Sequence, residues 1–407
     1  MLTRRHLLCC GAAAGLFTSL AGPARAGLLN TCRSGIPDDL KPLLARGFAG
    51  LDPAQLWDVH THLLGTGDSG SGCSVNAQLS QWWHPVEMLR KRFILNAACV
   101  PVDAPSVDRA YVERLRALAD DFPTGARWML FAFDQACDEA GRPQAAHTTF
   151  HVPDAYAAGV AAAHADRFAW VASIHPYRPD ALTRLDAALA GGAVALKWLP
   201  SSMNIDLRDR RLRPFYERLA LARLPVIVHC GEERAVPGAG RDALGNPQLV
   251  RAALEQGVRI VVAHCASLGT ALDLDQKRPR LAPAFTLFAR LMDEDWGGRL
   301  LGDVSVVLQA NRGPEVARTL FTREDWHPRL LHGSDYPLPG IPAAIRLPAL
   351  VSAGLLDADD APLLERLREH NPLLFDLALK RAAHWRGARL SPVVFATRPH
   401  FERPAVS

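Results

Sequence analysis

The sequence predicts an α/β fold, a (β/α)8 TIM barrel, and this prediction depends on where its apolar runs end. Five short runs end in a histidine, a lysine or an aspartate: 56–62, 194–197, 225–229, 260–264 and 330–335. The terminal residues of the last four runs are 32, 35 and 71 residues apart, and 135 residues separate the first run from the second. Because a βα unit occupies roughly 30 residues, the runs are expected on strands one, four, five, six and eight of an eightfold repeat.

This assignment brings together residues that are distant in the sequence. The carboxyl ends of all eight strands open on one face of such a barrel, and that face carries the active site. His60 and His62 are two residues apart, and side chains at that spacing point to the same side of a strand. We therefore expect one cluster of terminal residues, made up of His60, His62, Lys197, His229, His264 and Asp335.

Apolar periodicity and the positions of Pro and Gly predict the remaining elements. Strands are expected near 56–60, 127–133, 169–174, 193–198, 225–229, 258–264, 303–307 and 329–333. Helices are expected near 38–46, 84–97, 105–121, 154–166, 179–190, 210–223, 246–256, 277–291, 313–323, 342–353 and 359–380. A loop rich in Gly and Ser, residues 63–81, follows the first strand and is predicted to cover the mouth of the site.

The chain is predicted to divide into a signal peptide at 1–26, a lead-in segment at 27–55, one barrel domain at 56–384 and an irregular tail at 385–407. Paired arginines, Arg4 and Arg5, precede a weakly apolar run that is too short to span a membrane. A small-x-small cleavage site ends at Ala26. This order is typical of a twin-arginine signal, so we expect a periplasmic or secreted protein.

Composition and charge narrow the range of partners. The chain has 49% hydrophobic and 22% charged residues, as an ordinary globular protein does. Removal of residues 1–26 takes away three arginines and no acid, which leaves 43 basic against 42 acidic residues. Such a balance favours neither nucleic acid nor an anionic membrane as partner. We expect a small-molecule substrate, no membrane contact beyond export, and a chain compatible with a homodimer.

Six cysteines follow residue 26, and an oxidising compartment permits disulfides between them. Cys230 and Cys265 each follow a histidine of the cluster, and strand alternation predicts that they are buried thiols. Cys32, Cys73 and Cys137 lie in loop-like sequence and are the better disulfide candidates, with the pairing left open.

The residue types of the cluster are those of a divalent metal site. Neutral imidazoles and carboxylates bind zinc, and also manganese, iron or nickel. Four histidines and an aspartate exceed the needs of one catalytic zinc, which indicates a pair of metals. Lys197 would repel a cation as an ammonium. As the carbamate formed with carbon dioxide, N6-carboxylysine, it would be an anionic ligand able to bridge two metals.

This ordered set resembles the signature of the amidohydrolase superfamily of metal-dependent hydrolases. That signature is His-x-His on strand one, an often carbamylated lysine on strand four, a histidine on each of strands five and six, and an aspartate on strand eight. The stretch 371–375, Asn-Pro-Leu-Leu-Phe, is also similar to the closing stretch of the amidohydrolase-2 branch. That branch includes lactonases, amide and ester hydrolases, and decarboxylases of aromatic or muconate-type acids.

The resemblance implies hydrolysis of a C–O or C–N bond of a lactone, ester or amide by metal-activated water. Asp335 would take a proton from the water and deliver it to the leaving group. His60 and His62 would bind the first metal with Asp335, and His229 and His264 the second. With a single metal, His264 would polarise the substrate or act as general base.

Two alternatives are compatible with the same residues. Many members of the branch use one metal, and Lys197 would then contact substrate rather than metal. That arrangement suits non-oxidative decarboxylation of an unsaturated or aromatic acid. The other alternative is a non-catalytic metal-binding protein of the periplasm, because function depends on the site and not on the fold.

Further residues are candidates for substrate binding because they lie at strand ends or in the following loops. These are His175, Trp198, Glu232 and Arg312, the last as a partner for an anionic group. One of Glu232 and Glu233 is also expected to orient a ligand imidazole.

Overall fold

The computed structural model describes residues 29–76, 85–233, 236 and 241–402. The predicted signal peptide therefore lies outside the described residues. Eight parallel strands form one sheet, in the order β1, β3, β5, β6, β7, β8, β11, β12. Their bounds are β1 (Trp57–His62), β3 (Arg127–Phe131), β5 (Phe168–Ala172), β6 (Ala195–Trp198), β7 (Val226–His229), β8 (Ile260–Ala263), β11 (Leu300–Asp303) and β12 (Leu330–Leu331).

The first strand and the chain after the last strand complete the barrel. The Val59 amide donates to the carbonyl of His332 at 3.1 Å, and the His62 amide donates to the carbonyl of Tyr336 at 3.0 Å. Thr61 and Tyr336 form a parallel bridge between these segments. The predicted (β/α)8 fold is thus confirmed, with the sheet closing through the irregular chain that follows β12.

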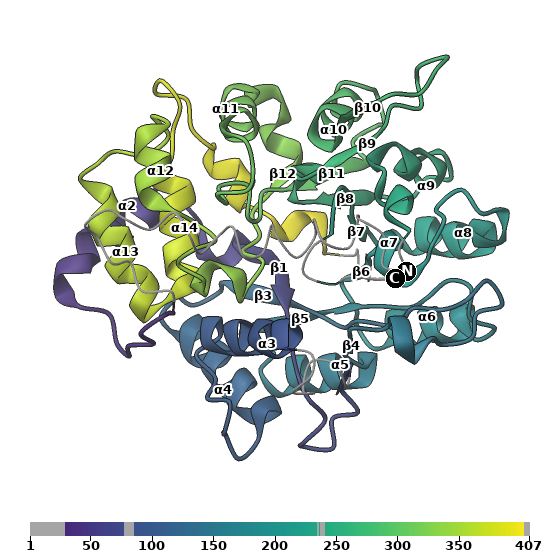
Figure 1. The fold of residues 1–407 in the computed structure, drawn as a ribbon, viewed down its shortest axis with the longest axis horizontal. Helices are drawn as coiled ribbons and strands as arrows, with labels where there is room; N and C mark the ends of the chain where they lie inside the picture. Colours follow the sequence, from purple (N-terminus) through teal and green to yellow (C-terminus); the bar gives the residue numbers. More distant parts are fainter. Residues whose placement is uncertain (1–28, 77–84, 234–235, 237–240, 403–407) are drawn as a thin grey trace, which may run out of the picture.

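Helices surround the sheet (Figure 1). They are α2 (Lys41–Phe48), α3 (Pro85–Ala97), α4 (Val107–Asp120), α5 (Asp154–Ala163), α6 (Ala181–Ala190), α7 (Pro200–Met203), α8 (Arg213–Ala222), α9 (Arg251–Glu255), α10 (Ala284–Met292), α11 (Pro314–Thr322), α12 (Leu347–Ser352), α13 (Asp360–His370) and α14 (Pro372–Ala382). No helix in the described part of the chain is long and apolar enough to cross a membrane.

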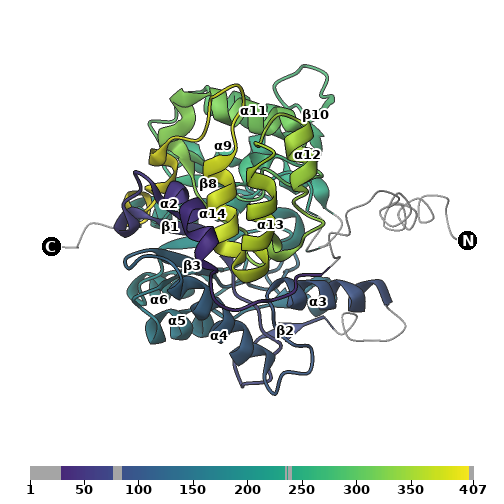
Figure 2. The same ribbon diagram turned by 90° about the vertical axis from the view of Figure 1, so that its left-hand side faces the viewer.

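The lead-in helix α2 lies against the C-terminal helix α14, although more than 300 residues separate them in sequence (Figure 2). Gly47 faces Ala378 at this contact, where a Cβ on residue 47 would lie at an ordinary van der Waals distance of 3.6 Å from the Cα of Ala378. The segment before the barrel is therefore packed on its outer layer.

The barrel interior is filled by apolar side chains from alternate strand positions, including Val59, Ile227 and Val261. Phe401, in the C-terminal segment, belongs to the same cluster and is 1% exposed. Thr397 fixes this segment to the start of β1, because its hydroxyl donates to the Trp57 carbonyl and accepts from the Trp57 amide. The segment after residue 385 thus covers the amino-terminal end of the barrel, with two 3-10 turns, Pro392–Phe395 and Arg398–His400.

Some predicted elements differ from those observed, and three of the differences have a clear local cause. Strand seven was expected at 303–307 but is Leu300–Asp303, because the apolar residues that follow it pack in a turn where Val306 has φ 48°. The helix expected at 277–291 begins only at Ala284, since Pro283 is its N-cap; a hairpin of β9 (Thr270–Leu272) and β10 (Leu281–Pro283) precedes it. Asn371 and Pro372 divide the helix expected at 359–380 into α13 and α14.

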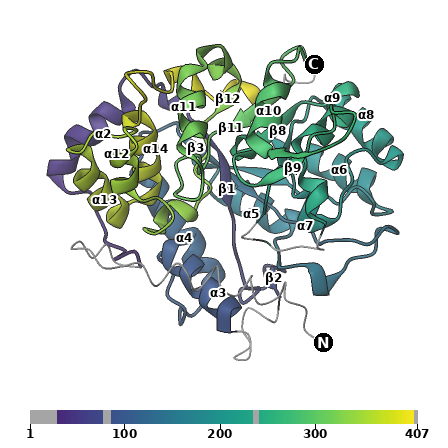
Figure 3. The ribbon, with the colours of Figure 1, turned by 45° about the horizontal axis from the view of Figure 1, so that its top comes forward.

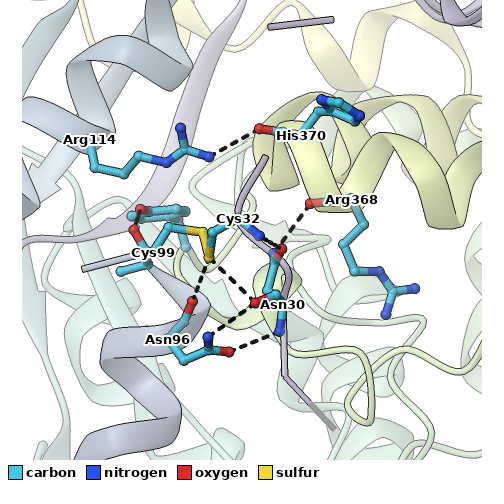
Figure 4. The surroundings of a disulfide bond; sticks show 9 residues. Asn30, Cys32, Asn96, Cys99, Arg114, Arg368 and His370 are labelled. Atoms are coloured by element: carbon cyan, nitrogen blue, oxygen red, sulfur yellow. Dashed lines mark hydrogen bonds between the residues drawn. A yellow bond between two sulfur atoms is a disulfide. The ribbon is translucent and has the colours of Figure 1, made fainter. Parts of the chain in front are cut away.

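The structure contains one disulfide among the described cysteines, between Cys32 and Cys99, so the candidacy of Cys73 and Cys137 is wrong: both are buried thiols. Cys230 and Cys265 are buried thiols, as predicted. The disulfide joins the lead-in segment to the end of α3 (Figure 4). Paired hydrogen bonds between Asn30 and Asn96, of 2.9 and 3.1 Å, reinforce this junction.

We predict that replacing Cys32 and Cys99 with serine lowers the free energy of unfolding by roughly 2–4 kcal/mol, because the bridge restricts the unfolded chain. The bridged residues are 67 apart in sequence. Urea unfolding should show the same loss for the wild type in reductant and no effect of reductant on the double variant. Equal stability of the wild type and the variant under oxidising conditions would contradict this prediction.

Candidate metal centre

The two histidines of β1 reach the barrel interior through a break in strand alternation. The pairing of β1 with β3 shifts register between Asp58 and Thr61. Val59 belongs to the interior cluster, yet the ring of the next residue, His60, also meets interior side chains, with its centroid 4.8 Å from that of Phe131. Such irregularities re-aim side chains next to active sites. Regular alternation from Val59 would have turned His60 away.

Lys197 and His229 reach the interior by regular strand alternation. Each lies two residues beyond an interior residue of its own strand, Ala195 on β6 and Ile227 on β7, so alternation carries it to the interior face. The Lys197 ammonium lies 4.8 Å from the centre of the Phe131 ring.

His264 and Asp335 are turned toward the centre by left-handed backbone. His264 has φ 54° and follows the interior residue Ala263, so a continued strand would have pointed it outward. Asp335 has φ 61°. A non-glycine residue in this conformation is strained, and such residues concentrate at functional sites.

The six predicted residues converge. The Oδ1 atom of Asp335 lies 2.9 Å from His62 Nε2 and 3.4 Å from His60 Nε2, and its Oδ2 lies 4.0 Å from His264 Nε2. Lys197 Nζ is 3.4 Å from His60 Nε2. The rings of His229 and His264 are 5.2 Å apart. The nitrogens of His60 and His62 and an oxygen of Asp335 form a group whose ligand atoms all lie within 4.8 Å of one another.

Asp303 is an organising residue that the sequence analysis missed. It ends β11 and is fully buried. One carboxylate oxygen lies 2.9 Å from His60 Nδ1, and the other accepts from the backbone amide of His264 at 3.0 Å. Ser305 Oγ lies 2.7 Å from His264 Nδ1. A correct end for strand seven would have pointed to Asp303, because each strand end faces the site.

His229 is supported by the loop that follows β7. Glu233 Oε2 lies 3.3 Å from His229 Nδ1, so Glu233, of the two glutamates considered, orients an imidazole. The other nitrogen, Nε2, is buried and has no hydrogen-bond partner among the described residues. A buried polar atom left in this state is costly, and a metal ion would satisfy it.

Burial controls the protonation of the cluster. Loss of solvent lowers the pKa of His60 and of His264 well below the ordinary value, and lowers that of His229. The nearby Lys197 charge depresses the pKa of His60 further. Burial also lowers the pKa of Lys197 to about 8, against the opposing effect of Asp303 and Asp335. Imidazoles held neutral keep a nitrogen lone pair available for a metal.

The cluster lies in a cavity of about 370 Å³. One wall is apolar and comes from α3, from the start of α4 and from strands β2 (Ser74–Val75) and β4 (Phe150–His151); it includes Ile94, Leu95 and Phe150. Gly65 and Thr66 of the Gly/Ser loop line the cavity as well. Figure 3 shows the chain running from β1 to β2 beside α3.

The Gly/Ser loop is held in place by hydrogen bonds. The carboxylate of Asp108, in the first turn of α4, accepts from the amides of Thr66 and Gly67 and from the hydroxyl of Ser71. Asp68 in turn accepts from the amides of Val107 and Asp108 at the start of the same helix. Residues 66–71 of the loop therefore form a fixed part of the cavity wall, whereas its residues 77–81 lie outside the described part of the chain.

The predicted substrate contacts divide into two groups. Arg312 and Glu232 line the cavity. Arg312 donates to the Ser267 hydroxyl, its Nε is buried without a partner among the described residues, and burial lowers its pKa to about 10.

His175 and Trp198, both expected to contact substrate, do not line the cavity. His175 Nε2 is 2.7 Å from the Met203 carbonyl, and the Trp198 indole donates to the Ile174 carbonyl at 2.8 Å. Trp198 alternates with Lys197 on β6 and packs outward on Phe215. Both side chains are fully buried outside the cavity.

The donor set fits a divalent metal. His60, His62 and Asp335 offer a three-ligand group, the unpartnered Nε2 of His229 adds a fourth donor, and burial keeps three of the imidazoles neutral. Nitrogen and carboxylate donors of this kind suit zinc and related metals.

Residues 57–375 match the protein family described as amidohydrolase (Amidohydro_2). The match covers most of the chain, which therefore belongs to the amidohydrolase family, as its sequence motifs predicted. Members of this family are typically dependent on a divalent metal. No curated protein sequence matches the chain.

Three solved structures are among those to which the chain is similar. An uncharacterised TIM-barrel protein from Bordetella bronchiseptica is 18% identical (TM-score 0.45), over 70% of this chain and 87% of that one. A putative 2-pyrone-4,6-dicarboxylic acid hydrolase from Pseudomonas putida is 19% identical (TM-score 0.41), over 79% and 97%. The 5-carboxyvanillate decarboxylase from Sphingomonas paucimobilis is 11% identical (TM-score 0.45), over 79% and 96%.

Two buried histidines at strand ends provide a test of the ligand set. We predict that His229→Gln binds less zinc per chain than the wild type, because it removes a donor nitrogen that faces the cavity, whereas His175→Gln retains the wild-type amount. The measurement is zinc per folded chain after reconstitution and gel filtration. Equal zinc in the wild type and His229→Gln would remove His229 from the ligand set.

Proposed function

We propose that the protein is a metal-dependent hydrolase that cleaves a C–O or C–N bond of a lactone, ester or amide. The observation that supports this most is the convergence of His60, His62 and Asp335 at 2.9–3.4 Å inside a cavity, with His229 and His264 beside them. The family relationship supports chemistry of this general class and leaves the reaction open.

A divalent metal bound here, zinc in the first instance, would lower the pKa of a water molecule toward neutrality and polarise the scissile group. His60 and His62, with Asp335, would hold one metal of a pair, and His229 and His264 would hold the other through ring nitrogens that face the cavity. Asp335 contacts both histidines of β1 through Oδ1 and faces His264 through Oδ2. We assign to Asp335 acceptance of the water proton at Oδ2 and its delivery to the leaving group.

The cavity also indicates how substrate would be held. The apolar wall of Ile94, Leu95 and Phe150 would bind the substrate body and exclude water. Arg312 would bind an anionic group, because a carboxylate offers its Nε the partner that this atom lacks among the described residues. Glu232, which lines the same cavity, would contact the polar end of the substrate.

The alternative is a non-oxidative decarboxylase that uses one metal. It is favoured by the position of Lys197, whose ammonium faces His60 Nε2 at 3.4 Å as a substrate-directed cation would. In that case Lys197 and Arg312 would receive the substrate carboxylate, and His264 would act as the proton donor or acceptor. The three-ligand group formed by His60, His62 and Asp335 is sufficient for a single metal.

We further propose that the protein is exported in its folded state and works in the periplasm or outside the cell. The support is the paired arginines at Arg4 and Arg5 and the Cys32–Cys99 disulfide, which suits an oxidising compartment. Cleavage after Ala26, shown by the mass of protein recovered from the periplasmic fraction, would test this.

Metal content decides the role of Lys197. We expect two metals per chain in the wild type and no more than one in Lys197→Ala, because a carbamate at this residue would bridge the pair. The measurement is plasma mass spectrometry of protein purified without chelators, with His175→Gln as the control. One metal in both proteins would place Lys197 on the substrate, and no metal even after adding zinc or manganese would overturn the proposal.

Turnover tests the role of Asp335. We predict that Asp335→Asn lowers kcat by a factor of at least about 10³, the upper part of the range for loss of a general acid–base group, while the protein keeps its melting temperature. A panel of lactones, esters and amides should first yield a substrate for the wild type. An Asp335→Asn enzyme of wild-type activity would remove the proton-transfer assignment.

A further inference from the structure

We propose that Asp303 and Ser305 are positioning residues that fix the tautomers of His60 and His264 together, so that both present an unprotonated Nε2 to the cavity. The inference deepens the proposed function, since it concerns the preparation of the site for a metal. Asp303 lies at the end of β11, while His60 and His264 belong to β1 and to the turn after β8. One carboxylate thus connects histidines from two strands that are not neighbours.

The first carboxylate oxygen of Asp303, Oδ1, is held by backbone donors. It accepts hydrogen bonds from the amide of His264 at 3.0 Å and from that of Ser305 at 3.1 Å. Backbone amides are donors without an alternative role. The Ser305 hydroxyl also donates to this oxygen. Oδ1 is therefore the fixed end of the carboxylate.

The second oxygen sets His60. Asp303 Oδ2 lies 2.9 Å from His60 Nδ1, so a carboxylate there draws the imidazole hydrogen to Nδ1. The hydrogen cannot be on both nitrogens of a neutral ring, so Nε2 keeps its lone pair. Nε2 is the atom that faces Asp335 at 3.4 Å and Lys197 at 3.4 Å.

Ser305 links Asp303 to His264 and fixes the tautomer of that histidine. Because the Ser305 hydroxyl donates its hydrogen to Asp303, its oxygen is left to accept from His264 Nδ1, 2.7 Å away. His264 Nε2 then carries the lone pair and faces Oδ2 of Asp335 at 4.0 Å. The nearest partner of His60 Nδ1 is the Asp303 carboxylate at 2.9 Å, with the Ser305 hydroxyl farther away at 3.4 Å, whereas that of His264 Nδ1 is the Ser305 hydroxyl at 2.7 Å. Substitutions at Asp303 and Ser305 should therefore affect the two histidines to different extents.

Asp303→Asn makes a sharp test because the amide can be accommodated in one orientation. Its oxygen must replace Oδ1, since an NH2 group there would face two backbone amide donors. The NH2 group then replaces Oδ2 and points at His60 Nδ1, which must become an acceptor. The variant keeps the backbone hydrogen bonds but moves the His60 hydrogen to Nε2, the nitrogen that the metal requires.

The experiment has one arm that needs no metal. Long-range 1H–15N correlation spectra of the metal-free protein labelled at histidine should show His60 and His264 as Nδ1–H tautomers in the wild type. His60 should become Nε2–H in Asp303→Asn, and His264 should lose its single tautomer in Ser305→Ala. Signals are assigned by their loss in His60→Gln and His264→Gln. Unchanged tautomers in the two test variants would overturn the proposal, whatever the fate of the hydrolase assignment.

The second arm measures Zn²⁺ affinity by competition with a chelator. Asp303→Asn should bind Zn²⁺ roughly 10–100-fold more weakly, and Ser305→Ala should lose less. The control is Asp273→Asn, an equally buried aspartate that pairs with Arg290, which should match the wild type. An equal loss in the control, or wild-type affinity in Asp303→Asn, would contradict the inference. If Asp303→Asn does not fold, the His264 spectrum of Ser305→Ala still decides it.

Discussion

The site depends on the closure of the barrel between β1 and the chain that follows β12. The Asp335 amide donates to the carbonyl of His60 at 2.7 Å, so the hydrogen bond that joins the two ends of the sheet also joins two of the candidate ligands. Asp58 strengthens the same junction between β1 and the chain after β12, since its Oδ1 accepts hydrogen bonds from the amides of His60 and Ser334. Behind it, Lys380 on α14 donates to the Gly333 carbonyl and to Asp376. The positions of His60, His62 and Asp335 therefore depend on the pairing of β1 with the chain that follows β12.

Local departures from regular structure place four of the six cluster residues. His60 and His62 depend on the register shift between Asp58 and Thr61 of β1. His264 and Asp335 have left-handed backbone, which costs about 1–3 kcal/mol for each such residue. Hydrogen bonds offset part of this cost: the amide of His264 is held by Asp303, and that of Asp335 by His60. Lys197 and His229 follow simple alternation. Cluster residues on β1, after β8 and after β12 therefore depend on irregular backbone, whereas those on β6 and β7 face the interior by regular strand alternation.

The sequence was sufficient for the repeat and for the cluster, because strand ends in a barrel converge regardless of local detail. The sequence did not predict the structure correctly where an apolar run forms a turn and not a strand. Residues 304–308 are as apolar as a strand but form a turn, and the error hid Asp303, the carboxylate that supports two histidines. Position at a strand end put Trp198 among the expected substrate contacts, whereas alternation with Lys197 turns it outward. The pairing of Cys32 with Cys99 depends on how the lead-in segment crosses α3, which no local pattern encodes.

The C-terminal segment has a consequence for the order of assembly. Phe401 completes the interior of the barrel, and Thr397 bonds to Trp57 across 340 residues of sequence. During synthesis, the strands can be made in order, but the amino-terminal end of the barrel stays open until the chain has been extended past residue 401. Contacts of such separation are slow to form, so the nascent chain carries an incomplete core while it is being translated. The native barrel therefore cannot be complete before Thr397 and Phe401 are available, although the first histidines of its ligand group are made long before them.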